Sequence, residues 1–264
     1  MTKTEKKYII IVTKEKDKFM DINEQDFKAE LSKTFKANGL GQLLNAERSE
    51  KFLTLTKRLL EENEKYNLTA ITEPKKIILN HYADCATLAL RLPKGASVID
   101  VGCGAGFPSI PLAIVRDDLK IFAIDSTAKR VNYVSKTAEL LGLKNLTAEV
   151  MRAEDGAKMP EYRESFDFAT ARAVANLRVL TELCLPYVKL GGAMIAMKGK
   201  NAEYELSESK KAIAILGGKG AKIENITLKS SDEDATHPLV IIEKKAKTPS
   251  AYPRPFAQIS KKPL

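Results

Sequence analysis

The sequence predicts an α/β fold in which a mainly parallel, seven-stranded sheet carries helices on both faces and follows an N-terminal helical region. From residue 96 onward, short β-branched runs alternate with segments of helical periodicity. This order is typical of parallel strands joined by crossover helices. The 264 residues are 44 % hydrophobic, which suffices for a large domain with a packed core.

The seven expected strands are short apolar runs bounded by polar residues or glycine. They cover residues 97–101, 119–125, 145–151, 166–171, 193–198, 223–228 and 239–243. The later connections are expected to be helical over residues 127–141, 177–189 and 202–216, and Gly142 is a usual C-terminal stop for the first of these. The sheet and its helices define an expected core over residues 96–245.

Residues 21–95 show a helical pattern. Phe52, Leu55 and Leu59 recur at positions i, i+3 and i+7, which indicates one apolar helix face. A loop is expected over residues 63–72, and a second helix begins near Pro74, where a missing N–H is tolerated. This region is therefore predicted to pack on the core.

Both ends of the chain are basic. Residues 1–20 are lysine-rich and are expected to form a mobile extension. Residues 246–264 contain four prolines and no acidic residue, which predicts an extended tail. Basic tails of this kind either increase solubility or bind nucleic acid.

Charge and cysteine content narrow the class of protein. The net charge of +9 favours a polyanionic partner, although many basic proteins bind none. The longest apolar runs are too short to cross a bilayer, so no membrane association is expected. Cys85, Cys103 and Cys184 have no C-x-x-C spacing and, with only two histidines in the chain, predict free thiols, a cytoplasmic location and no metal site.

A glycine-rich turn follows the first expected strand, in the segment Asp100-Val-Gly-Cys-Gly-Ala-Gly-Phe-Pro108. Gly102, Gly104 and Gly106 allow a ligand to approach the backbone closely. Phe107 stands where a dinucleotide fingerprint requires glycine, and the Gly-Lys-Ser/Thr of a P-loop is absent. The pattern resembles motif I of class I methyltransferases, which implies their Rossmann-like fold and S-adenosylmethionine as cofactor. Asp100 would then orient the loop or contact the cofactor's amino group.

An acidic residue ends the second expected strand. Asp125 lies 19 residues after Gly106, close to the spacing of about 20 at which an acid accepts hydrogen bonds from ribose hydroxyls. It also precedes a helix that begins near Thr127 and is therefore able to cap that helix. The two roles are compatible.

The segment after the fourth strand narrows the methyl acceptor. Residues 166–174 lack the Asn/Asp-Pro-Pro-aromatic motif of base amino-group methylation and the Pro-Cys of cytosine C5 methylation. A ring nitrogen or hydroxyl fits better, and guanine N7 needs no general base because its lone pair is free. Arg172 and Lys198 end the fourth and fifth strands and are the candidate catalytic residues, although either side chain is also able to form a simple ion pair.

Several further motifs occur in one order: Asn67-Leu-Thr-Ala-Ile71, His81-Tyr-Ala-Asp84, Thr170-Ala-Arg-Ala-Val174, Glu182-Leu-Cys-Leu-Pro186 and Thr248-Pro-x-x-Tyr-Pro-Arg254. Together with the glycine-rich turn they resemble the RsmG family, also called glucose-inhibited division protein B, over residues 43–264. These proteins are bacterial 16S rRNA guanine-N7 methyltransferases. Ser109, Cys103 and Pro255 depart from the usual family pattern.

The resemblance implies roles for individual residues. Gly102 and Phe107 would line the cofactor site, and Arg172 would contact cofactor or substrate. The remaining cofactor contacts would be Asp125, Ser126 and Thr127 at the ribose and Ala153 and Glu154 at the adenine. Apart from the resemblance, the strand-end position of Lys198 and the basic tail that contains Arg254 make these two residues the expected RNA contacts. The expected partner is 16S rRNA or a small-subunit assembly particle, and the expected state is a monomer.

Three other functions remain open from the sequence. In the first, the chain is a methyltransferase whose acceptor is a protein or a small molecule. In the second, it is a non-catalytic RNA-binding assembly factor. In the third, it is an NAD oxidoreductase. The basic tail and Arg172 argue against the first, and the intact glycines and Asp125 argue against the second. Phe107 argues against the third.

Overall fold

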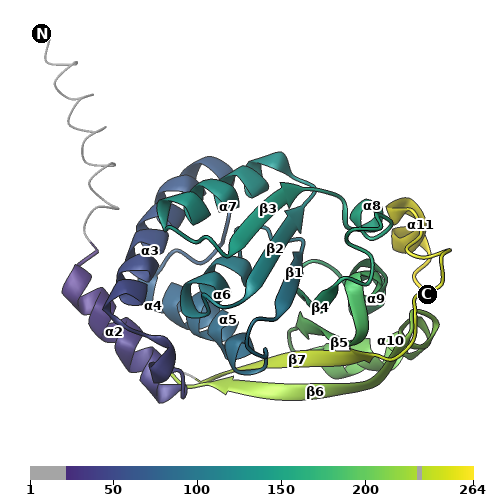
Figure 1. The fold of residues 1–264 in the computed structure, drawn as a ribbon. Coiled ribbons are helices and arrows are strands. Elements are labelled where there is room, and N and C mark those ends of the chain that lie inside the picture. The colour runs from purple at the N-terminus through teal and green to yellow at the C-terminus, as the bar shows by residue number, and fades with distance from the viewer. Residues whose placement is uncertain (1–21, 231–233) are drawn as a thin grey trace, which may run out of the picture.

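The computed structural model describes residues 22–230 and 234–264, and the extension expected over residues 1–20 lies outside them. A seven-stranded sheet forms the centre (Figure 1). In the order β3-β2-β1-β4-β5-β7-β6, its strands are β3 (Leu146–Val150), β2 (Lys120–Asp125), β1 (Ser97–Val101), β4 (Phe166–Arg172), β5 (Val188–Met197), β7 (Ala235–Lys244) and β6 (Gly218–Leu228). The strands β1 to β5 are parallel, whereas β7 runs antiparallel to both of its neighbours. The predicted mainly parallel sheet is confirmed.

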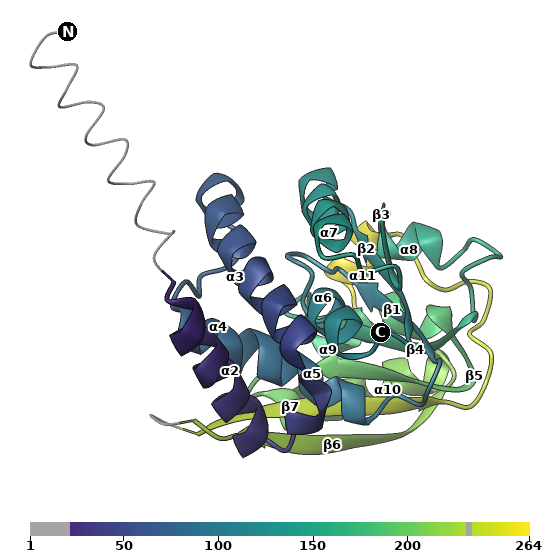
Figure 2. The ribbon, with the colours of Figure 1, turned by 60° about the vertical axis from the view of Figure 1, so that its left-hand side comes forward.

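Apolar residues alternate between the two faces of the central strands. In β1, Val98 belongs to one buried layer and Ile99 to the other. Such strands are apolar on both sides because helices cover both faces of the sheet. One face carries α2 (Glu24–Ala37), α3 (Ala46–Tyr66), α6 (Ser109–Val115) and α7 (Ala128–Leu140), and the other carries α8 (Ala153–Gly156), α9 (Leu177–Cys184), α10 (Ala202–Ile215) and α11 (Phe256–Lys261). Figure 2 shows the first group from the side.

A continuous helical run over residues 74–90 joins the N-terminal helices to the sheet. It begins with α4 (Pro74–Ile77), widens into a π-helical turn (Ile78–Ala83), and continues through α5 (Asp84–Thr87) into a 3-10 turn (Leu88–Leu90). Pro74 is in the first turn, as expected. Single π turns of this kind are frequent at functional sites.

Several predicted boundaries were wrong. The expected helix over residues 177–189 ends at Cys184, and β5 begins at Val188 rather than at residue 193. Pro186 explains this difference, because it has no N–H to donate to the Glu182 carbonyl oxygen, and the chain passes into a 3-10 turn (Leu185–Tyr187) before β5 begins. The helix α3 extends to Tyr66, where Asn67 ends it with a left-handed φ of 49°, so the expected loop over residues 63–72 is shorter.

The β6–β7 hairpin is longer than its side-chain pattern indicates. The two strands begin at Gly218 and Ala235 instead of at residues 223 and 239. The two strands pair with each other along most of their length, from Gly218 with Lys244 to Leu228 with Ala235. Backbone pairing thus extends strands whose outer residues are polar. Charged side chains on β6, such as Lys222 and Glu224, suit its position at the edge of the sheet.

The C-terminal tail is not extended throughout. It contains α11, whose Ile259 is fully buried. Arg163 donates hydrogen bonds to the carbonyl oxygens of Thr248, Pro249 and Tyr252. These contacts explain the difference from the prediction, since the tail finds partners on the core that its own sequence does not reveal. Across the described parts of the chain, no helix combines the length and apolar character that a membrane span requires.

Arg254 holds the tail to α9 through a buried carboxylate. Its Nη2 and Nε donate to the two carboxylate oxygens of Glu182 at 2.6 and 2.8 Å, and Glu182 is fully buried. Removing the guanidinium would leave the buried carboxylate without a counter-charge, with the backbone N–H of residue 254 as its remaining donor. We therefore expect Arg254→Ala to lower the free energy of unfolding by about 3 kcal/mol in urea denaturation. Lys261→Ala, on the same tail, is the control. Unchanged stability in Arg254→Ala combined with weaker RNA binding would instead favour the RNA-binding role.

Candidate active site

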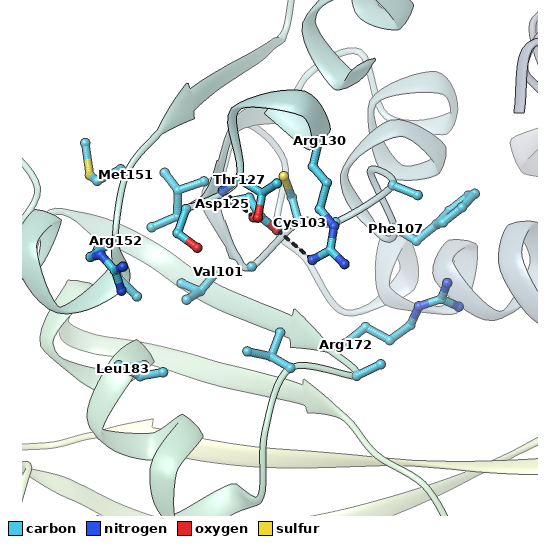
Figure 3. Close-up of a pocket in the computed structure, with 18 of the residues that line it drawn as sticks. Val101, Cys103, Phe107, Asp125, Thr127, Arg130, Met151, Arg152, Arg172 and Leu183 are labelled. Carbon is cyan, nitrogen blue, oxygen red and sulfur yellow. Dashed lines mark hydrogen bonds and ion pairs between the residues drawn. The ribbon is translucent and has the colours of Figure 1, made fainter. Parts of the chain in front are cut away.

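A cleft of about 480 Å³ opens at the carboxyl ends of β1, β2 and β4. The strand order reverses here, because β1 lies between β2 and β4, and ligands of open α/β sheets bind at such a point. Figure 3 shows Met151, Arg152 and Leu183 at one end of the cleft and Phe107 and Arg172 at the other, with Asp125 and Thr127 between them. Its volume is within the usual range for small-molecule sites, roughly 300–1,000 Å³.

The glycine-rich turn forms the floor of the cleft. Gly102 has a φ of +74°, and a Cβ there would lie 2.8 Å from a methyl carbon of Val174. A Cβ on Gly106 would clash with the side chain of Ile110 of α6. Gly102, Gly104 and Phe107 line the cleft, as expected for cofactor contacts, whereas Gly106 lies outside its wall and packs against α6.

Asp100 is fully buried and also lies outside the cleft wall. One carboxylate oxygen accepts a hydrogen bond from the Ser109 hydroxyl, and no described residue bonds to the other. Burial raises the pKa of Asp100 to about 6, although the hydrogen bonds from Ser109 oppose this shift. Of the two roles expected for Asp100, this geometry favours orienting the turn, since the carboxylate fixes the first residue of α6.

The raised pKa of Asp100 has a predictable effect on stability. As the pH rises from about 4 to 6, the unfolded chain loses this proton before the folded chain does, so the stability contribution of the protonated carboxyl is lost as pH passes through the folded pKa. We expect Asp100→Asn, which removes this titration, to gain about 1 kcal/mol in unfolding free energy over the parent between pH 5 and pH 7.5. Urea denaturation at both pH values measures this gain. Asp117→Asn, at an exposed carboxyl, should show no such gain. The prediction would be contradicted if the unfolding free energies of Asp100→Asn and the parent differed by the same amount at both pH values.

Asp125 ends β2 in the middle of the cleft. Its carboxylate accepts hydrogen bonds from the backbone N–H groups of Gly104 at 3.1 Å and Thr127 at 2.8 Å. The Arg130 guanidinium lies 3.6 Å away and forms an ion pair (Figure 3). The carboxylate therefore joins the glycine-rich turn to the start of α7 and still lines the cleft, as do Ser126 and Thr127. The geometry is compatible with both expected roles of Asp125.

The end of the cleft opposite Arg172 is formed by α8 and α9. Ala153, Glu154, Met151 and Leu183 line it. The Tyr187 hydroxyl donates a hydrogen bond to the Ala153 carbonyl oxygen at 2.7 Å and thereby fixes α8 to the sheet. Glu154 is buried, and Arg152 places a guanidinium nitrogen 3.9 Å from its carboxylate.

Arg172 is held by the π-helical turn at the other end of the cleft. Its Nη1 donates to the Asn80 carbonyl oxygen at 2.9 Å and lies 3.4 Å from an Asp84 carboxylate oxygen. Its Nη2 lies 3.0 Å from His81 Nδ1. The Phe107 ring lies against both Arg172 and His81. Its centre is 5.1 Å from the Arg172 guanidinium carbon and 4.4 Å from the centre of the His81 ring. The guanidinium therefore has a fixed position.

The contacts of His81 fix the orientation of its ring. Nδ1 lies 3.0 Å from Arg172 Nη2, which only donates, and 3.1 Å from the Asn80 carbonyl oxygen, which only accepts, and Nε2 lies 2.9 Å from the Thr69 hydroxyl. Burial and the Arg172 cation lower the pKa of His81 to about 4. The imidazole is therefore neutral at physiological pH.

Asp84 offsets the charge of Arg172. It is buried, with one carboxylate oxygen facing Arg172 and the other 3.0 Å from Nδ1 of His237 on β7. The hydrogen bond and charge of Asp84 raise the pKa of His237 above its usual value. The carboxylate thus balances a cation that would otherwise be only partly compensated at the cleft.

The two residues predicted to contact RNA do not line the cleft. Lys198 donates to the Ala175 carbonyl oxygen at 2.9 Å and pairs with Glu205 at 2.7 Å, outside the cleft wall. Arg254 pairs with buried Glu182 instead of projecting from the surface. Both side chains are engaged within the protein, and their roles toward RNA stay predictions.

Other residues of the cleft were not identified as functional from the sequence. They are Leu68, Thr69, His81, Val101, Cys103, Ala105, Ile124, Arg130, Met151, Arg152, Ala173, Val174, Leu183 and Phe256. A signal existed for His81, because it and Asp84 are three residues apart on a predicted helix and share one face. Phe256 carried no such signal, since only the folding of the tail brings it to the cleft.

Comparison with known proteins identifies the family. A family model described as GidB, rRNA small subunit methyltransferase G, matches residues 48–233. Ribosomal RNA small subunit methyltransferase G of Clostridium perfringens is 46 % identical over 229 residues, which cover 86 % of this chain and 95 % of that protein. The protein of the same name from Lactobacillus johnsonii is 41 % identical over 247 residues, covering 92 % and 100 % of the two chains. The resemblance found in the sequence motifs is confirmed, and the chain belongs to the GidB family of small-subunit rRNA methyltransferases.

Proposed function

We propose that this protein transfers a methyl group from S-adenosylmethionine to N7 of a guanine in 16S rRNA. The observation that carries the proposal is the arrangement of the cleft. An acidic residue, Asp125, lies in its middle, an apolar end is formed by α8 and α9, and a fixed guanidinium, Arg172, marks the other end. From the apolar end to Arg172, these three environments suit an adenine, a ribose and a reacting group in that order.

The residues of the cleft suit this cofactor. Asp125 supplies acceptors for the ribose hydroxyls, and Met151 and Leu183 supply apolar contacts for the adenine. Gly102 leaves no room for a side chain between the turn and Val174, so the backbone itself forms the contact surface. When bound, S-adenosylmethionine supplies an activated methyl group on a positively charged sulfur.

Arg172 is the residue that we assign to the acceptor base. Its Nη1 and Nη2 engage Asn80 and His81, and within the described chain its Nε–H has no bonding partner. An arginine donor is suited to guanine O6, and donation to O6 leaves N7 free to react. Because Phe107 and His81 fix the guanidinium, the base would be oriented without further rearrangement.

The proposed reaction needs no general base. The N7 lone pair forms the new bond to carbon, the carbon–sulfur bond breaks with its electrons on sulfur, and the positive charge passes to the purine. No proton is transferred. Asp84 compensates Arg172, so the site does not oppose the charge that the purine acquires. His81 remains neutral and acts only through the position of Arg172.

The acceptor form and the state of the protein belong to this proposal as well. We place the enzyme in the cytoplasm as a monomer that acts on 16S rRNA or on a small-subunit assembly particle. The net charge of +9 supports a polyanionic substrate. Lys198 and Arg254 remain candidate RNA contacts outside the cleft wall. The domain boundaries near residues 21, 96 and 246 also remain part of the proposal.

The test is methyl transfer from labelled S-adenosylmethionine to unmodified 16S rRNA, offered free and as a small-subunit particle. The expected result is label recovered after digestion as 7-methylguanosine at one site. Label recovered in another nucleoside would refute the proposal that guanine N7 accepts the methyl group. Binding of S-adenosylhomocysteine without labelling of either RNA form would refute the acceptor and leave the cofactor assignment in place.

A further inference from the structure

The cleft includes a residue from the C-terminal tail. Phe256 is the first residue of α11 and lines the cleft, although it is 84 positions after Arg172 in the sequence. Its side chain is 43 % exposed, and within the described chain its ring forms no aromatic or cation–π pair. An aromatic ring at the edge of a cleft without a protein partner is available to a ligand.

The position of Phe256 is fixed by contacts on both sides of it. Arg254, two residues earlier, pairs with buried Glu182 of α9, and Ile259, three residues later, is fully buried. Arg178 of α9 donates to the Leu264 carbonyl oxygen at 2.8 Å. The tail is therefore held to α9, the helix that also supplies Leu183 to the cleft.

These contacts place Phe256 at the end of the cleft away from Arg172. In Figure 1, α11 lies beside α8, whose residues Ala153 and Glu154 form that end. In Figure 3, Leu183 and Met151 lie on the side opposite Arg172. A group bound near Arg172 and a group bound near Phe256 are therefore at different ends of one ligand site.

We propose that Phe256 packs against the adenine of the cofactor and closes this end of the cleft. The inference rests on the proposed cofactor site and adds a wall that comes from the tail. The Arg254–Glu182 ion pair would then have two effects: it holds the tail to α9, and it positions the ring that contacts the ligand. Phe256 is a binding residue and takes no part in the reaction at the methyl group.

The test compares two ligands that share the adenosine and differ at the other end. S-Adenosylhomocysteine and 5′-methylthioadenosine are titrated calorimetrically into the parent protein, Phe256→Ala and Phe256→Tyr. We expect Phe256→Ala to weaken both ligands by the same factor, about tenfold, and Phe256→Tyr to bind within about twofold of the parent. Tyr204→Ala, at an exposed aromatic residue of α10 outside the cleft, is the matched control.

A second readout is independent of affinity. The chain contains no tryptophan, so Phe256→Trp introduces a single indole whose fluorescence should change on addition of S-adenosylhomocysteine. Parent-like affinity of Phe256→Ala for both ligands, or an unchanged indole signal at saturation, would overturn the inference. A raised KM for rRNA with unchanged nucleoside affinity would overturn it in favour of an RNA contact. If the parent binds neither ligand, the proposed cofactor site itself fails, which is a distinct result.

Discussion

Arg172→Ala is expected to lower kcat/KM for rRNA methylation by about a hundredfold to a thousandfold and to leave the affinity for S-adenosylhomocysteine within about threefold of the parent. The reason is the fixed guanidinium at the end of the cleft, which we assign to the guanine. Removing a preorganised donor affects the transition state more than it affects the binding of the cofactor. Single-turnover methylation and calorimetric titration measure the two quantities separately.

The surroundings of Arg172 provide graded variants. Arg172→Lys should recover little activity because an ammonium group does not reproduce the planar fork. His81→Ala should reduce kcat partially, and His81→Asn, which retains an acceptor for Arg172, should recover part of that loss. Arg48→Ala, in α3 and outside the cleft wall, is the control. Activity of Arg172→Ala within tenfold of the parent would contradict the assignment, as would a loss explained by a lower unfolding temperature.

Asp125→Ala is expected to weaken the binding of S-adenosylhomocysteine by about a hundredfold. The substitution removes the acceptors for ribose and also releases the backbone N–H groups of Gly104 and Thr127. Asp125→Asn keeps one neutral acceptor, so its affinity for S-adenosylhomocysteine should fall only about tenfold. The difference between the two variants separates ligand contact from support of the glycine-rich turn.

The control for Asp125 is Asp155→Ala, because Asp155 is an exposed acid on nearby α8 outside the cleft wall. It should bind the ligand as the parent does. Equal affinity in Asp125→Asn and the parent would mean that the carboxylate does not contact the ribose. The raised KM for the cofactor should follow the raised dissociation constant, with kcat little changed at saturation.

The sequence predicted the sheet and the central part of the cleft because both depend on local patterns. Short apolar runs identify strands, and Gly102, Asp125 and Arg172 each stand at the end of one. Parallel strands then bring these residues to the same edge. The prediction is thus a consequence of topology, and it requires no knowledge of side-chain packing.

Other features depend on contacts between distant segments and were missed. The end of α9 at Cys184 is decided by Pro186 and by the pairing of Val188 with Phe166 of β4. His81 meets Arg172 only because the N-terminal helices pack beside β4. Phe256 reaches the cleft through the tail. A pattern within ten residues carries no information on partners almost a hundred positions away.

The π-helical turn (Ile78–Ala83) makes the position of Arg172 sensitive to chain length. A π turn accommodates one more residue than the corresponding α-helical turn, so a single-residue deletion that restored α-helical bonding would remove that extra residue while the segments on either side kept their phase. The Asn80 carbonyl oxygen would then be shifted relative to the Asp84 carboxylate, and the two would no longer face one guanidinium together. The extra residue therefore places an acceptor toward Arg172 without redirecting the helix on either side, and single-residue deletions here should be far more damaging than conservative substitutions.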